Sequence, residues 1–199
     1  MAGFRSLASA ALSVVRLLNA CFDEEQPIGT GTPAIAVLVR TEDFELRKSE
    51  AGRIPKVGLS IFPYRVDLNY TMRPGWAAVG SFDGRGHLPL DMHVLLTPWA
   101  TNPEHELQIL GRAMQCLEAF PIFSGPALER LGDWERTESI QIVLGQITTE
   151  EIMRTFDSLP QDYKLSVPYL LRSVRVDTDA VVRPEVSTVI TGLVASAAT

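Results

Sequence analysis

The sequence has few cysteines, and the two that it has lie far apart. Cys21 and Cys116 show no CxxC spacing, which argues against a dense disulfide framework. Two separate thiols in apolar, helix-like surroundings are typical of a protein from a reducing compartment. We therefore interpret both cysteines as small buried side chains without a redox role.

Basic residues are scattered, with no concentrated cluster. The longest cluster is the pair Arg47-Lys48, and the formal net charge is −6. A protein that binds nucleic acid presents concentrated positive charge to the phosphate backbone. This composition argues against nucleic acid as a partner.

Long apolar runs are missing as well. A membrane-spanning helix needs about 20 mostly apolar residues, and since no run in the chain approaches that length, we expect no membrane insertion. The segment before Cys21 has a superficial likeness to a lipoprotein leader, but Arg16 interrupts its apolar run. We prefer an amphipathic helix, with Arg5, Ser9, Arg16 and Asn19 away from its apolar stripe. The stripe consists of Phe4, Leu7, Ala8, Ala11, Leu12, Val15, Leu18 and Phe22.

The chain does have enough apolar material for one folded domain. Hydrophobic residues make up 46% and charged residues 21%, which are ordinary values for a globular protein. A chain of this length buries roughly 70% of the surface that its unfolded form exposes. We predict a single domain over residues 1–179 and a tail over residues 180–199.

Two apolar, β-branched segments predict the first strands. Ala34–Arg40 is apolar on both faces, which predicts a strand well inside a sheet. Val57–Tyr70 alternates in two phases that meet at Phe62-Pro63, which predicts a bulge or a bend. Because proline cannot donate a hydrogen bond to a neighbouring strand, this strand should lie at an edge of the sheet, or switch partners, near Pro63. We interpret the charged segment Thr41–Lys56 as a surface loop.

Helix start signals complete the predicted fold. Asn102-Pro103-Glu104 supplies an N-cap, a proline at the first helical position and an early acid, and this helix should end before Pro121. Thr148 and Glu151 have the spacing of a capping box. These elements predict an α/β fold of the α+β type, a mixed, largely antiparallel sheet flanked by helices. The remaining strands are expected within His87–Ala100, Ser139–Gly145 and Val167–Asp177.

One cluster has residue types that could bind a metal. Residues 91 and 93 of a strand point to the same side, so His87, Asp91 and His93 could bind a metal ion with His105 or Glu106. A closed zinc site needs four ligands, and the spacing of the sequence recommends no third and fourth ligand. We favour ordinary hydrogen-bonded side chains here, and expect no cofactor. A small metal-dependent enzyme using this cluster is the less favoured alternative.

The three tryptophans lie in or beside predicted loops. Trp76 shares the segment of residues 71–86 with Phe82, Trp99 follows a strand, and Trp134 lies in the connection of residues 122–137. Tryptophan is enriched at the positions that dominate protein interfaces. Two interpretations stay open, namely contact residues or side chains packed beneath their own loops.

Four segments occur in a recognisable order, namely Leu59–Val66, Leu88–Thr97, Glu104–Met114 and Ser166–Tyr169. Their combination resembles the cap-protein family of extracellular contractile injection systems, which is related in architecture to phage tail terminators. The likeness covers about residues 7–177. Pro63, Gly75-Trp76 and the alanine-rich tail depart from the family pattern.

The resemblance implies a structural protein rather than an enzyme. It implies a tail-terminator-like homohexameric ring that ends the inner tube and anchors the last sheath layer of a cytoplasmic particle. The expected partners are copies of the chain, the tube and the sheath. A phage tail terminator is the close alternative, although the absence of a basic lining favours protein cargo over a genome.

Rings of this kind use heterologous interfaces, in which one surface meets a different surface of the neighbour. An open strand edge is also expected to accept an extended arm of a sheath subunit, at the strand of Pro63 or at Val167–Asp177. The side chains expected at contacts are Pro63, Tyr64, Arg65, Trp76, Phe82, Trp99, Trp134, Tyr169, Arg172 and Arg175.

Overall fold

The computed structural model of the protein describes residues 2–29, 31–45, 52–73 and 85–178. Six strands form one sheet in the order β1-β2-β3-β6-β5-β4. β1 runs parallel to β2 and the other neighbouring pairs are antiparallel, so the predicted mixed, largely antiparallel sheet is confirmed. The strands are β1 (Ile35–Leu38), β2 (Gly58–Leu68), β3 (His87–Trp99), β4 (Ile122–Ser124), β5 (Ser139–Leu144) and β6 (Val167–Asp177).

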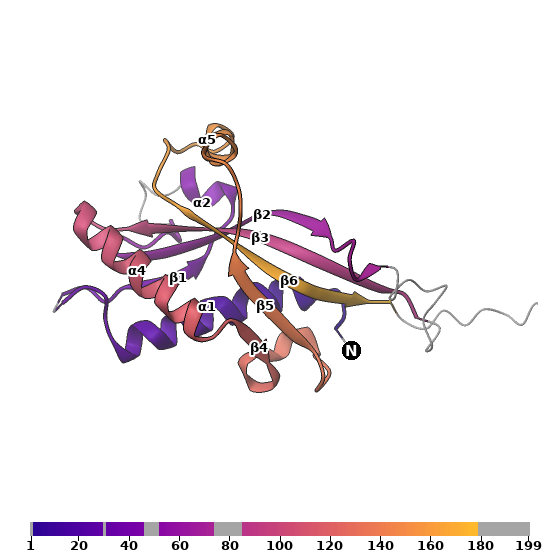
Figure 1. Ribbon diagram of the computed structural model, residues 1–199. Coiled ribbons are helices and arrows are strands. Elements are labelled where there is room, and N and C mark those ends of the chain that lie inside the picture. Colours follow the sequence, from indigo (N-terminus) through magenta and orange to yellow (C-terminus); the bar gives the residue numbers. More distant parts are fainter. Residues whose placement is uncertain (1, 30, 46–51, 74–84, 179–199) are drawn as a thin grey trace, which may run out of the picture.

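Helices cover both faces of the sheet, with α1 and α4 on one face and α2 and α5 over the other (Figure 1). A larger core lies between α1, α4 and the sheet, and a smaller core lies between α2, α5 and the opposite face. The helices are α1 (Ser6–Glu24), α2 (Thr41–Glu45), α4 (Pro103–Ala119) and α5 (Thr149–Asp157).

The central strands are buried on both faces because successive side chains of a strand point to opposite sides. Val94 and Leu96 of β3 enter the larger core, whereas Leu95 between them enters the smaller one. Each fully buried apolar side chain of these strands contributes roughly 1.5–3 kcal/mol to the stability of the fold. The strand β3 therefore stabilises both cores at once.

The predicted helix starts are confirmed. The side chain of Asn102 accepts a hydrogen bond from the backbone N–H of His105 at 2.8 Å, and Pro103 opens α4. At α5, the Thr148 hydroxyl accepts from the Glu151 N–H at 3.2 Å, and the Glu151 carboxylate accepts from the Thr148 N–H at 2.8 Å. These contacts satisfy backbone donors that the first helical turn leaves unpaired.

The predicted position of the first strand is wrong. β1 is the edge strand of the sheet, not an interior strand. Both its faces are apolar because helices cover both, with Ala36 in the larger core and Val37 packed against the smaller one. The loop predicted over Thr41–Lys56 contains α2, where the Asp43 carboxylate accepts from the backbone N–H of Arg40 at 2.9 Å.

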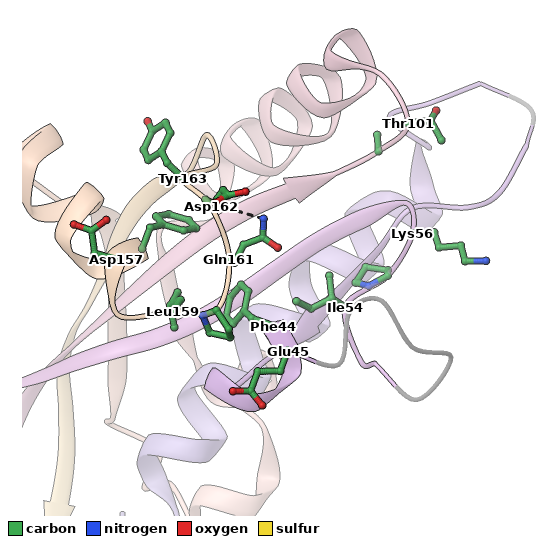
Figure 2. Close-up of a pocket in the computed structure, with 14 residues that line it drawn as sticks. Phe44, Glu45, Ile54, Lys56, Thr101, Asp157, Leu159, Gln161, Asp162 and Tyr163 are labelled. Atoms are coloured by element: carbon green, nitrogen blue, oxygen red, sulfur yellow. Dashed lines mark hydrogen bonds between the residues drawn. The ribbon is translucent and has the colours of Figure 1, made fainter.

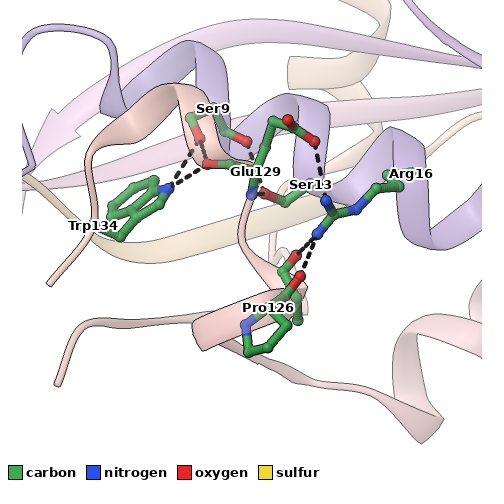
Figure 3. A network of polar contacts seen from close by, with 7 residues as sticks. Ser9, Ser13, Arg16, Pro126, Glu129 and Trp134 are labelled. Atoms are coloured by element: carbon green, nitrogen blue, oxygen red, sulfur yellow. Dashed lines mark hydrogen bonds and ion pairs between the residues drawn. The ribbon is translucent and has the colours of Figure 1, made fainter. Parts of the chain in front are cut away.

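The buried face of α1 differs from the predicted stripe. Phe4 is 82% exposed and Ala8 is exposed, whereas Ser9 and Ser13 are buried. The connection after β4 packs on this side, where the Ser9 hydroxyl donates to the carbonyl oxygen of Glu129 at 2.5 Å (Figure 3). The Ser13 hydroxyl accepts from the Glu129 N–H at 2.7 Å. Tertiary hydrogen bonds thus compensate for burying serine.

The two cysteines form a disulfide, so their interpretation as separate thiols is wrong. Cys21 and Cys116 lie 95 residues apart in sequence, with Cα atoms 6.4 Å apart. The packing of α1 against α4 brings them together, a contact that spacing within the sequence does not reveal. Their predicted burial is confirmed.

Helix α1 reaches the length and mean hydropathy of a membrane-spanning segment, contrary to the expectation from apolar runs. It has 19 residues, and half of its most apolar window is buried inside the fold. Its contacts with β1, β6 and α4 are those of a core helix.

We expect Leu96→Ala to lower the free energy of unfolding by about 2–5 kcal/mol, because truncating a buried leucine leaves a cavity. Leu96 is fully buried in the larger core. Leu107→Ala on α4 is the matched control, since Leu107 is 58% exposed, and should change stability by about 0.5 kcal/mol or less. Urea unfolding measures both, and equal losses would contradict this assignment of the core.

Candidate functional site

The outer edge of β2 is open along most of its length. β1 pairs with β2 only over Gly58–Ile61, and the N–H of Val39 adds one bond to the carbonyl oxygen of Ile61 at 3.0 Å. From Phe62 to Leu68, no strand of the described chain pairs with this side. We call Phe62–Leu68 the open edge.

Two predictions about the open edge are confirmed. The register with β3 shifts between Pro63 and Arg65, so the predicted bulge is present. Pro63 lies beyond the end of β1, at an edge of the sheet. Proline and bulges on an edge strand oppose indiscriminate pairing with other chains.

A charged cluster lies on one face of the open edge. Arg65 and His93 both contact the Asp67 carboxylate, at 2.6 Å from the Arg65 guanidinium and 2.9 Å from His93 Nε2. Val66 points to the opposite face and is 46% exposed. The open edge therefore combines a side that no described strand pairs with, one polar face and one apolar face.

Tyr64 lies where the open edge meets α5. It lines a hollow of about 450 Å³ together with Thr41, Arg154 and Thr155. Its hydroxyl is buried and has no hydrogen-bond partner among the described residues. Burial raises the pKa of Tyr64, so the phenol stays protonated and keeps a hydrogen to donate.

The expected contact residues do not gather at one place. Pro63, Tyr64 and Arg65 lie together on the open edge, and Trp76 and Phe82 lie outside the described residues. Trp99 is fully buried and donates to the Ser60 hydroxyl at 2.8 Å, so its expected role as a contact residue is wrong.

Trp134 is partly buried beside α1, where its indole N–H donates to the Ser9 hydroxyl at 2.9 Å (Figure 3). The same N–H also donates to the carbonyl oxygen of Glu129 in its own loop at 2.9 Å, which agrees with the second interpretation of the tryptophans.

Over Tyr169–Arg172 the last strand is an interior strand, so the open edge that the sequence suggested is wrong for this part of it. β6 lies between β3 and β5, which pairs with Tyr169–Arg172. Tyr169 is buried, and Arg172 is exposed. Arg175 is largely buried in ion pairs with Asp177, at 2.8 Å, and with Glu138. Arg175 thus joins β6 to the segment before β5.

The residues of the hypothetical metal site each contact a different partner and do not converge on one point. His87 contacts Asp177 at 2.6 Å, and His93 contacts Asp67 instead. The Asp91 carboxylate accepts from the Asn69 side chain at 3.1 Å and from a backbone N–H of β6 at 3.0 Å. No group of three potential ligands converges among the described residues.

A hollow lies between α2 and the segment after α5 (Figure 2). It has a volume of about 1270 Å³, an apolar wall of Phe44, Phe156 and Leu159, and a charged rim that includes Glu45 and Lys56. Its described lining includes neither histidine nor cysteine, so a nucleophile with a histidine base is not assembled there. Sequence reasoning missed this hollow because α2 lies in a segment interpreted as a loop.

Residues 11–188 match the sequence model of the Pvc16 N-terminal domain. The chain belongs to the Pvc16 N-terminal domain family. The family resemblance expected from the sequence is confirmed by this match together with the two similar structures described next. No curated protein matches the chain in sequence.

The fold of the chain is similar to solved structures that include the following two. One is the sheath/tube terminator of an extracellular contractile injection system, PVC, in the extended state, with 16% identity and a TM-score of 0.50. The other is the tube-terminating cap of the anti-feeding prophage, with 17% identity and a TM-score of 0.54. Each match covers 94% of this chain, which spans 65% and 59% of those chains respectively.

We expect Tyr64→Phe to raise the free energy of unfolding by about 1 kcal/mol, because it removes a buried hydroxyl that has no partner among the described residues. Tyr70→Phe is the control, since Tyr70 is 79% exposed and should give no change. Thermal unfolding measures both variants. A loss of stability in Tyr64→Phe would mean that the hydroxyl is hydrogen-bonded in solution.

Proposed function

We propose that this protein is the structural cap of a contractile injection system, a subunit that ends the inner tube. The observation that carries the proposal is membership of the Pvc16 N-terminal domain family, supported by a fold similar to a sheath/tube terminator and a tube-terminating cap. His87, His93 and Asp91 each contact a different partner, namely Asp177, Asp67 and Asn69, which favours this role over a metal-dependent enzyme.

The cap acts as a homohexameric ring assembled on the particle in the cytoplasm. In such a ring, one surface of each subunit meets a different surface of the next, and closure stops further growth. A phage tail terminator would work in the same way, and the net charge of −6 favours protein cargo instead of a genome.

The open edge is the proposed attachment point for the sheath. An extended arm of a sheath subunit would add as a strand along Phe62–Leu68 and pair with backbone groups that β1 leaves free. Pro63 and the bulge restrict which arms fit, since they limit pairing to part of the edge. The exposed side chains of Arg65 and Val66 give the arm one charged and one apolar face to match.

The ring is tested by cryo-electron microscopy of intact particles together with native mass spectrometry. We expect six copies at the end of the tube, and a species of six times the 21.9 kDa subunit mass when the ring is released. Finding the subunit anywhere else on the particle would refute the cap.

The attachment point is tested by Val66→Lys, because a charged lysine on an edge strand opposes the addition of another strand. We expect particles with this variant to lose most of their extended sheath in negative-stain images. Met153→Lys on α5 is the matched control, since Met153 is 49% exposed and lies off the open edge. Normal sheath retention in both variants would mean that the sheath attaches to another part of the protein.

A further inference from the structure

The disulfide joins the ends of the two helices that cover the larger core. Cys21 is in the last turn of α1 and Cys116 is in the last turn of α4. Arg112 of α4 donates to the carbonyl oxygen of Cys21 at 3.1 Å and lies 3.4 Å from the Glu25 carboxylate. The end of α1 is thus tied to α4 covalently and also through a largely buried guanidinium.

Asn19, two residues before Cys21 in α1, holds β1 in place. The Asn19 side chain donates to the carbonyl oxygen of Ala36 at 2.9 Å and accepts from the N–H of Ala36 at 2.8 Å. This amide satisfies both backbone groups of Ala36, as a neighbouring strand would. Each such hydrogen bond contributes about 0.5–1.5 kcal/mol, which matters for an edge strand of four residues.

The end of β1 decides where the open edge begins. β1 pairs with Gly58–Ile61, and a Cβ atom at Gly58 would lie 2.1 Å from the carbonyl oxygen of Ile35. This close approach and the φ of 147° allow only glycine at position 58. If β1 loosened, the free edge of β2 would extend back to Gly58.

We propose that the Cys21–Cys116 disulfide is a redox lock on this edge of the sheet. When closed, it immobilises the end of α1 from Asn19 to Glu24, and Asn19 then holds β1 on β2. When open, β1 and this end of α1 loosen, while Arg112 and the cores keep the rest of the domain folded. The lock goes beyond the proposed cap and does not depend on it. Only its consequence for a sheath arm rests on the proposed function.

Closing the lock is a thiol–disulfide exchange with a small-molecule disulfide as the oxidant. One cysteine thiolate attacks a sulfur of the oxidant, which forms a mixed disulfide and releases one small thiol. The second cysteine thiolate then attacks the sulfur of the first cysteine and releases the other small thiol. Two protein thiols are oxidised and one small disulfide is reduced to two thiols.

Hydrogen exchange of the isolated chain, oxidised and after reduction with a phosphine, tests the lock. In the reduced chain we expect amides of the last turn of α1 and of β1 to exchange about tenfold faster, with α5 unchanged. Alkylation and intact mass confirm each redox state. Unchanged exchange in β1 would overturn the lock, and so would a loss of protection that includes α5.

Two variants separate the lock from general destabilisation. The double variant Cys21→Ser and Cys116→Ser should show the amide exchange rates of the reduced chain, and the phosphine should not change them. In Asn19→Ala, the amides of β1 should exchange fast in both redox states, while those in the last turn of α1 should still exchange faster after reduction. If reduction still speeds up amide exchange in β1 of Asn19→Ala, the coupling through this side chain is overturned. Gln108→Ala, an exposed change on α4, is the control.

Because these measurements use the isolated chain, they give the same answer whether or not the protein forms a ring. Failure of the lock is therefore distinguishable from failure of the proposed cap function.

Discussion

The structure depends on keeping water from both faces of β3 and its neighbours. Leu95 and Leu96 point in opposite directions, and both are almost fully buried. One helical layer cannot meet this requirement, so α1 and α4 cover one face while α2 and α5 cover the other (Figure 1). Once both faces are covered, the edges of the sheet are the places where backbone groups are left for another chain.

The two covering layers also determine which part of the edge stays open. β1 is short, and α1 supplies through Asn19 the hydrogen bonds that a further strand would have made. Beyond Ile61, β2 continues without β1. Asn19 of α1 holds β1, and the end of β1 sets where the open edge begins. The packing of α1 is therefore linked to the proposed docking of a sheath arm.

Local signals in the sequence predicted the elements well. The Asn102 cap, the Thr148–Glu151 capping box and the phase slip beside Pro63 all depend on residues a few positions apart, so neighbouring side chains are enough to reveal them. The same reasoning placed Pro63, Tyr64 and Arg65 on an edge. It failed for Trp99, because position beside a loop does not show that Ser60 of another strand will bind the indole.

By itself, the sequence determined every strand except β4, the helix starts, the bulge and the family resemblance, because periodicity, caps and proline act through nearby backbone. Only the tertiary structure decided which strand lies at the edge, which face of α1 is buried and that Cys21 meets Cys116. These outcomes depend on how elements far apart in the chain pack together. The spacing of residues within one element does not show which other elements pack against it.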